Sequence, residues 1–287
     1  MKRLVVLVLP VMLPMVALAQ APADVTLTTA SVAPSKEPLV EFEMMTWVEV
    51  KNAIAAGRTT ALFYVGGTES RGPQNINGGH TLMARATNKA IALALGNAIA
   101  MPVLAYSPNN ASAEIPGTIG LTNDLLSAML ERMAEQAIAS GFTNVVLMGD
   151  HGGGQPAAYK SVADKLEAKY APQGKHVFFC DQVYATAQNA FENYLVSIGL
   201  NKSSHAGIQD TSEMWYLGGE VWTRSELIPT AVGAAVWNAE HPGSPPMASN
   251  GISGDARKSS KELGQKAFQN KVDYAVRQIR TFIPPKK

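Results

Sequence analysis

Cysteine is almost absent from this chain, which has one thiol, Cys180, among 287 residues. A single cysteine excludes an internal disulfide, so the fold has no covalent cross-link of its own. Cys180 follows the apolar run 177–179, which predicts a buried and inert thiol.

An excess of either charge is also absent, with 24 Lys and Arg against 23 Asp and Glu. This balance argues against nucleic acid or an anionic membrane surface as a partner.

Long hydrophobic runs are absent beyond the N-terminus. Residues 1–19 begin with two basic residues, continue with an apolar stretch and end in Ala17-Leu18-Ala19, a pattern typical of a signal peptide cut after Ala19. The alternative is a membrane anchor, but prolines interrupt this run, which is short for a bilayer span. Cleavage would change the net charge from +1 to −1, because it removes two basic residues. We expect an exported protein, periplasmic or secreted, with no stable membrane anchor after cleavage.

The remaining chain divides into two parts. Residues 20–40 are small, polar and proline-bearing, which predicts a flexible N-terminal segment. Residues 41–287 are expected to form a single domain, in which helical and strand patterns alternate. Helices are predicted at 44–57, 81–99, 122–140, 156–170, 185–198, 213–217 and 258–283, and strands at 60–65, 102–106, 145–148 and 175–180. This alternation predicts an α/β fold with a mainly parallel sheet covered on both faces.

Three of the five histidines lie in loops beside small and acidic residues. These are His80, His151 and His205, whereas His176 at a strand start and His241 beside a proline are expected to be incidental. The carboxyl ends of parallel strands meet at one edge of a sheet, so the three loops can converge there.

Two acids complete a set of possible metal ligands. Two or three imidazoles with the carboxylates of Glu69 and Asp210 would suit Zn²⁺, Mn²⁺ or Fe²⁺. Structural roles remain open for the same residues. Glu69 could pair with Arg71, His151 could fix a loop, Asp210 could cap a helix, and the glycines at 152–154 could simply allow a tight turn.

Two other motifs are incomplete. The sequence His151-Gly152-Gly153-Gly154 matches the HGGG loop of some esterases, but the G-x-S-x-G elbow of those enzymes does not occur. A phosphate-binding loop is excluded because no G-x-x-x-x-G-K-[ST] is present.

The order of five motifs over residues 44–264 resembles the creatininase family of metal-dependent amidohydrolases. Thr46-Trp47-Val48-Glu49-Val50 is similar to the family's T-W-x-E-V, and Gly66-Gly67-Thr68-Glu69-Ser70-Arg71-Gly72-Pro73 to its G-S-x-E-Q-H-G-P. Residues 115–119 resemble F-P-G-T-I, residues 149–153 resemble N-G-H-G-G, and residues 205–212 resemble H-A-G-x-x-E-T-S.

The resemblance implies a three-layer α/β/α domain, a metal centre at the strand carboxyl ends, and hydrolysis of C–N bonds in cyclic or linear amides. It also implies a homo-oligomer, commonly a hexamer. By position, Glu69 and His151 match metal ligands, His205 matches a proton donor beside the substrate, and Asp210 matches the glutamate of the H-A-G motif.

Two positions depart from the family pattern. Arg71 stands where the family has its second ligand histidine, and His80 stands where it has a bridging aspartate. An arginine remains protonated and cannot ligate a cation. We therefore expect one metal held by Glu69, His80 and His151, with Asp210 as a further ligand or a partner of the ligands. Arg71 would act catalytically, holding an anionic substrate group or the developing oxyanion.

The sequence thus predicts an exported metal-dependent amidohydrolase acting on a small-molecule amide. Zinc is the expected ion, with manganese or iron as alternatives, and one or two ions per subunit. Asp150, Gly152, Gly153 and Trp215 are the candidate substrate-binding residues. One alternative is an inactive protein on the same fold that binds a metal or a small molecule. A second is a metal-free hydrolase that uses Ser203 or Ser204 with His205.

Overall fold

The structure is a computed structural model that describes residues 37–109, 112–152, 155–202, 204–233 and 250–284. The chain separates into Met1–Glu37 and Pro38–Lys287, and the second part is one compact unit. The predicted signal peptide and most of the predicted N-terminal segment lie outside the described residues. No helix within the described ranges is long and apolar enough to cross a membrane.

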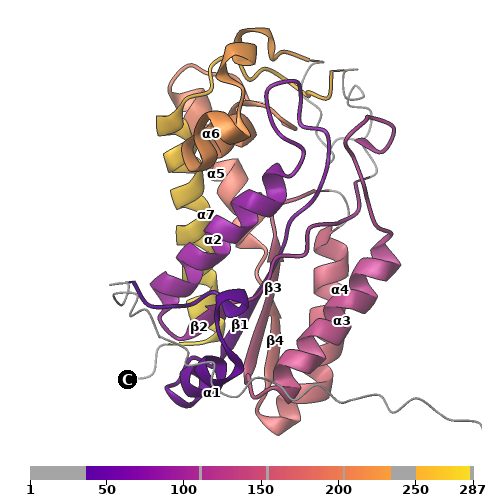
Figure 1. Cartoon of the computed structure of the whole chain (residues 1–287), viewed down its shortest axis with the longest axis vertical. Helices are drawn as coiled ribbons and strands as arrows, with labels where there is room; N and C mark the ends of the chain where they lie inside the picture. The colour runs from indigo at the N-terminus through magenta and orange to yellow at the C-terminus, as the bar shows by residue number, and fades with distance from the viewer. Residues whose placement is uncertain (1–36, 110–111, 153–154, 203, 234–249, 285–287) are drawn as a thin grey trace, which may run out of the picture. The chain divides into compact units, whose positions relative to one another are not determined.

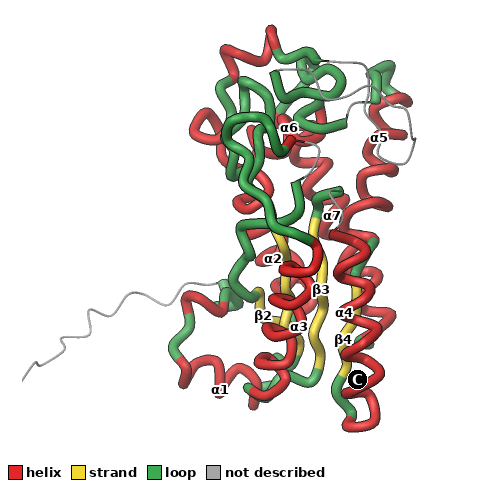
Figure 2. Tube along the Cα trace, turned by 90° about the vertical axis from the view of Figure 1, so that its right-hand side faces the viewer, coloured by secondary structure: helices red, strands yellow, loops and turns green. Residues whose placement is uncertain are grey.

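In the described part of the chain, four strands form one parallel sheet in the order β2-β1-β3-β4. They are β1 (Thr60–Val65), β2 (Ala98–Ala100), β3 (Asn144–Gly149) and β4 (His176–Phe179). Every residue of the central strand β1 is buried. A strand covered on both faces needs apolar side chains at successive positions, which is why β1 lacks the alternating pattern of a half-exposed strand. Figure 2 shows the strands lying among the helices.

Helices cover both faces of the sheet (Figure 1). Side chains of β1 alternate between two apolar clusters, with Phe63 on one face and Leu62 on the other. The first cluster includes α3 (Asn123–Ala139) and α4 (Gln155–Tyr170), and the second includes α2 (Gly79–Leu95) and α7 (Lys261–Phe282). The predicted three-layer α/β/α arrangement is therefore confirmed.

The remaining helices are α1 (Trp47–Ala55), α5 (Ala187–Ser197) and α6 (Ile208–Trp222), with shorter turns at Phe42–Met44, Ala171–Gln173, Gln182–Thr186 and Ser225–Thr230. Helix α1 begins with a capping box. The side chain of Thr46 accepts a hydrogen bond from the backbone of Glu49, whose carboxylate accepts one from the backbone of Thr46. This reciprocal pair satisfies two backbone donors at the helix start. Helix α6 is longer than the predicted segment 213–217.

The prediction for residues 81–106 was wrong in two respects. Helix α2 ends at Leu95 rather than at residue 99, and the edge strand beside β1 is 98–100, whereas the predicted strand 102–106 contributes an isolated bridge between Leu104 and Val65. The cause is Gly96, whose left-handed φ of 77° ends the helix. The apolar residues that follow are thereby released to pair with β1.

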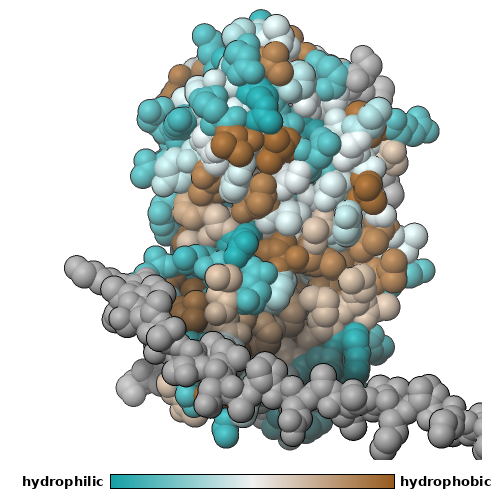
Figure 3. Space-filling view, in the orientation of Figure 1, coloured by the Kyte–Doolittle hydropathy of each residue, from teal (hydrophilic) through white to brown (hydrophobic). Residues whose placement is uncertain are grey.

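Part of the surface is apolar. Figure 3 shows hydrophobic side chains gathered across the middle of one face, with more hydrophilic side chains toward the top of the view. Among the large exposed apolar residues are Trp47, 76% exposed, and Val221, 73% exposed. Contiguous apolar surface often marks an interaction site, so this surface is compatible with the expected homo-oligomer, which remains a prediction.

The contact between α6 and α7 generates a test of the packing. Gly264 of α7 lies against the backbone of α6, where an added Cβ would overlap the carbonyl oxygen of Ser212. Gly264→Ala is therefore expected to lower the free energy of unfolding by about 1–3 kcal/mol, as overpacking usually does. Urea denaturation measures the change. Gln265→Ala, at an exposed neighbouring position, should stay close to wild type. Equal stability of the two variants would contradict the packing described here.

Candidate metal centre

The register of the sheet places two predicted ligands at the same edge. Val65 and Gly149 are partners at the carboxyl ends of the neighbouring strands β1 and β3. Glu69 follows four residues after Val65, and His151 follows two residues after Gly149. Parallel strands end side by side, so the two loops must leave the sheet together.

His80 reaches the same place from the first turn of α2. The end of β1 and the start of this helix approach so closely that a Cβ added at Gly66 would lie 2.6 Å from the Cα of Thr81. A residue with a side chain at position 66 would push the helix away. The glycine therefore allows His80 to lie against the Glu69 loop.

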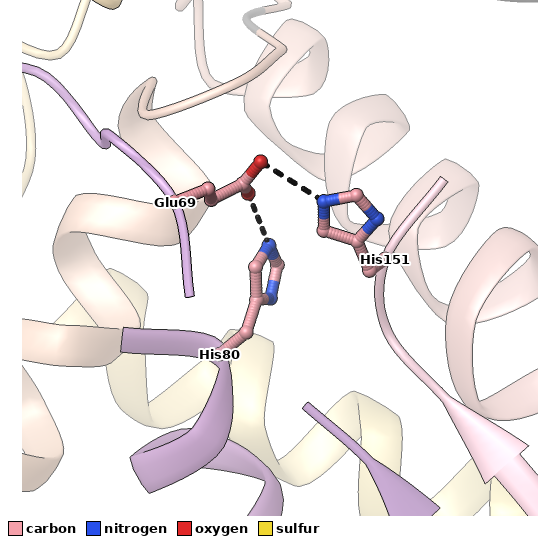
Figure 4. Close-up of side chains that lie close together, drawn as sticks. All are labelled: Glu69, His80 and His151. Carbon is pink, nitrogen blue, oxygen red and sulfur yellow. Dashed lines mark hydrogen bonds and ion pairs between the residues drawn. The ribbon is translucent and has the colours of Figure 1, made fainter. Parts of the chain in front are cut away.

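Glu69, His80 and His151 bring one possible ligand atom each into a group within 4.8 Å. Figure 4 shows the carboxylate facing both imidazoles, with one dashed line to each ring. One oxygen of Glu69, Oε1, lies 3.0 Å from Nε2 of His80, and the other, Oε2, lies 2.9 Å from Nε2 of His151. The two rings meet edge to face with centroids 4.9 Å apart, and all three residues are buried. The predicted association of these three side chains is thus present.

The carboxylate of Glu69 has further partners. Ser112 Oγ donates to Oε2 at 3.2 Å, while Arg71 Nη1 and His205 Nδ1 lie 3.3 and 3.5 Å from Oε1. Burial by itself would raise the pKa of Glu69, but the charges of His151 and His205 outweigh it and hold that pKa well below its usual range. Glu69 is therefore ionised at neutral pH, as a metal ligand must be.

Arg71 lies between two carboxylates. Its guanidinium has no exposed surface, and Nη2 lies 2.8 Å from Oδ2 of Asp210. Burial would lower the pKa of Arg71, but the charges of Asp210 and Glu69 raise it overall. The arginine is therefore a fixed cation beside the centre. Both carboxylates that contact Arg71 lie between its charge and any substrate effect. The catalytic role predicted for Arg71 remains a prediction.

Asp210 lies outside the group of three possible ligands. Besides Arg71, it accepts a hydrogen bond at 2.9 Å from the backbone of Ala206, so it also braces the start of α6. Burial would raise the pKa of Asp210, and the charge of Arg71 outweighs it and lowers the pKa. This geometry places Asp210 as the partner of Arg71, and its role as a ligand remains a prediction.

The second nitrogen of His80 also meets a carboxylate. Nδ1 of His80 lies 3.1 Å from Oδ1 of Asp150, and Oδ2 of Asp150 lies 2.8 Å from Nζ of Lys271. Lys271 in turn lies 2.8 Å from Oε2 of Glu213. Burial would raise the pKa of Asp150, but Lys271 and His80 lower it. Burial raises the pKa of Glu213, against the opposing effect of Lys271.

His205 approaches Glu69 from the turn before α6. Its Nε2 lies 2.6 Å from the backbone oxygen of Ser70, which can only accept, so Nε2 carries the hydrogen. Burial lowers the pKa of His205 and, together with the charge of Arg71, outweighs the charge of Glu69, which raises it. Because Nε2 donates to Ser70, Nδ1 is the ring nitrogen on the side of Glu69.

The turn that carries His205 is strained. Ala206 has φ of 57°, in the left-handed region that residues with a Cβ rarely adopt. Its carbonyl oxygen accepts hydrogen bonds from Gln74 Nε2 at 2.9 Å and Thr211 Oγ1 at 3.0 Å. These contacts, with the bond from its backbone to Asp210, hold the imidazole in its orientation.

The candidate substrate-binding residues lie in different settings. Gly152 is exposed next to His151, whereas Asp150 is buried between His80 and Lys271. Trp215 donates to Glu220 at 2.8 Å and has the amine of Lys261 5.4 Å from its ring. Gly153 lies outside the described residues, as does Ser203 of the alternative hydrolase. Contact of any of these residues with a substrate remains a prediction.

Sequence reasoning missed three residues near the centre, namely Ser112, Glu213 and Lys271. A signal for Lys271 was present in the sequence. It lies four residues after Ala267 and four before Ala275, and all three are buried on one face of α7. A lysine within an apolar stripe indicates a buried cation with an acidic partner. Ser112 and Glu213 carry no comparable signal.

The buried cysteine was predicted correctly. Cys180 has no exposed surface, and burial raises the pKa of its thiol to about 12. It is therefore protonated at neutral pH and is chemically inert.

The donor set fits a divalent metal ion. Two imidazole nitrogens and a carboxylate oxygen suit Zn²⁺, Mn²⁺ and Fe²⁺. The charges around these ligands also fit a divalent cation. Four carboxylates lie beside two permanent cations. With all carboxylates ionised and the histidines neutral, the net charge is −2. The carboxylates are those of Glu69, Asp150, Asp210 and Glu213, and the cations are Arg71 and Lys271.

A buried Glu-His-His group at the carboxyl edge of a parallel sheet defines a candidate metal-binding α/β protein. Residues 43–279 match the sequence profile of the family described as creatininase (creatinine amidohydrolase). The chain therefore belongs to the creatininase family.

Solved creatininase structures share this fold. A crystal structure of creatinine amidohydrolase (creatininase) has a TM-score of 0.70 at 22% identity, covering 88% of this chain and 100% of that one. A creatininase named with Mn gives 0.70 at 20% identity, over 86% and 100%. A mutant creatininase of the Zn–Zn type gives 0.69 at 21% identity, over 88% and 100%. No curated protein sequence shows significant similarity to the chain.

The buried position of Arg71 leads to a stability prediction. Arg71→Met should lower the free energy of unfolding by about 3–5 kcal/mol, because Glu69 and Asp210 would remain buried without their cation. Urea denaturation followed by circular dichroism measures the loss. The matched control is Arg257→Met, which removes an arginine that is 51% exposed and pairs with Asp255 at 2.6 Å. This control should change stability little, and equal losses in the two variants would refute the assigned role of Arg71.

Proposed function

We propose that this protein is an exported metal-dependent amidohydrolase that cleaves a C–N bond in a small cyclic or linear amide. The observation that carries the proposal is the buried group of Glu69, His80 and His151 in a chain of the creatininase family. We propose zinc as the ion, with manganese or iron as alternatives. Solved creatininases named with Mn and Zn support this choice. A single ion per subunit is favoured because Arg71, at the position of a family ligand, cannot ligate.

The metal would be held by Oε of Glu69 and Nε2 of His80 and His151. A divalent ion bound there would polarise an amide carbonyl and lower the pKa of a bound water. Both histidines must present an unprotonated Nε2 to the ion, because a ring nitrogen that carries a hydrogen has no lone pair to donate.

His205 is the residue that we propose moves the proton. Its hydrogen on Nε2 is donated to the carbonyl of Ser70, so Nδ1 is free to accept. Nδ1 would take a proton from the attacking water as the water oxygen bonds to the amide carbon. It would then return that proton to the departing nitrogen as the C–N bond breaks. The bond to Ser70 keeps the ring in place through both transfers.

Metal analysis and an amide panel test the proposal together. Purified wild-type protein is expected to bind one zinc per subunit and to hydrolyse at least one amide of a cyclic and linear panel. Glu69→Ala and His151→Ala should lose the zinc and reduce the rate by at least about 100-fold, because ligand loss abolishes water activation. The control is His176→Ala, whose ring pairs with Glu167 away from the group.

Three outcomes would change the assignment. Wild-type protein without zinc, or ligand variants that retain it, would contradict the metal centre. Bound zinc with no hydrolysis of any amide would support the inactive binding protein. Activity that survives a chelator would favour the metal-free hydrolase that uses Ser203 or Ser204 with His205.

Export has its own test. When the whole chain is expressed in a Gram-negative host, we expect it in the periplasm or the medium with Gln20 as its first residue. The expectation depends on the basic start, the apolar stretch and the small residues before Gln20. Cell fractionation and intact-mass measurement check it, with a variant lacking residues 1–19 as the control that stays in the cytoplasm. Uncleaved protein in the membrane fraction would contradict it.

A further inference from the structure

The buried side chains behind His80 form a continuous chain of contacts. Asp150 at the end of β3 meets Nδ1 of His80, Lys271 of α7 meets Asp150, and Glu213 of α6 meets Lys271. Each of these three acid and base side chains is 4% exposed or less. The lysine and Glu213 come from the two helices that pack on each other beyond the edge of the sheet (Figure 1).

We infer that Asp150, fixed by Lys271 and Glu213, is the positioning residue that makes His80 a metal ligand through Nε2. The inference rests on the proposed metal-dependent function. When an ion takes the lone pair of Nε2, the one hydrogen of the neutral imidazole lies on Nδ1, where Asp150 accepts it. The lone pair of Nε2 is then directed at the ion. A carboxylate behind a ligand histidine fixes the ring and increases its basicity.

Lys271 explains why Asp150 contacts His80 and does not itself bind the ion. The amine occupies Oδ2 at 2.8 Å, so Oδ1 is the oxygen left for the imidazole. Glu213 completes the arrangement, because a buried lysine facing a single carboxylate would have less of its charge compensated. The two helices thus determine the orientation of a ligand that neither of them contributes.

A purely structural role is the competing explanation. Buried ion pairs that only join helices affect stability when one partner is removed, and they leave the ligand geometry of a folded protein unchanged. Metal affinity and ring tautomer distinguish the two roles, because both report on His80 itself.

The test compares Asp150→Asn and Glu213→Gln with Asp164→Asn, which alters an exposed pair with Lys160. The probe is Zn²⁺ alone, titrated against a coloured chelator, and circular dichroism of the metal-free proteins verifies folding. Asp150→Asn should weaken zinc binding by about 10–100-fold, the usual effect of losing a carboxylate behind a ligand histidine. Glu213→Gln should weaken it less, and Asp164→Asn should match wild type.

An unchanged dissociation constant in folded Asp150→Asn would overturn the inference while leaving the proposed function intact. Wild-type protein that binds no zinc would overturn both. If Asp150→Asn does not fold, NMR of the zinc-loaded wild type decides, by correlating ring nitrogens with carbon-bound hydrogens. His80 should then show hydrogen on Nδ1 and zinc on Nε2. Zinc on Nδ1 of His80 would overturn the inference.

Discussion

The centre of this protein depends on one buried carboxylate, that of Glu69. An ionised carboxylate away from water is costly unless donors surround it, and here each oxygen has its own set. His80 and Arg71 lie at one oxygen, and His151 and Ser112 lie at the other. These partners come from the start of α2, the loop after β1, the loop after β3 and the loop before α3. The positions of these segments are therefore coupled, because a shift in any of them removes a donor from the same anion.

Charge pairing extends the same constraint outward. Arg71 meets Asp210 in the first turn of α6, and Lys271 of α7 meets Asp150 at the end of β3. Pairs of this kind contribute little net stability in the interior, whereas an isolated member is strongly destabilising. Their effect is mainly on specificity, since an alternative packing of α6 or α7 would separate a buried charge from its partner. The polar centre therefore selects one arrangement of helices that the apolar layers alone would leave less defined.

Much of the fold and part of the site could be predicted from sequence. The sheet edge was predictable because an apolar run that ends in glycines must leave the sheet there, which placed Glu69 and His151 together. The helix before β2 was extended too far, since the residues at 98–100 are as compatible with a helix as with a strand. The backbone of Gly96 decided between them. Lys271 was overlooked because a lysine in an amphipathic helix is usually solvated, and only the three-dimensional packing reveals its acidic partners.

The place of Lys271 in the chain has a consequence for assembly. Most of the sheet and both loops that carry ligands precede residue 152, whereas Lys271 belongs to the last helix in the described part of the chain. Domains generally fold as units, and the ligand loops and Lys271 belong to one compact unit. A chain cut before α7 would keep all three possible ligands and lose the amine that pairs with Asp150. The C-terminal helix is therefore required for the complete centre although it carries none of its ligands.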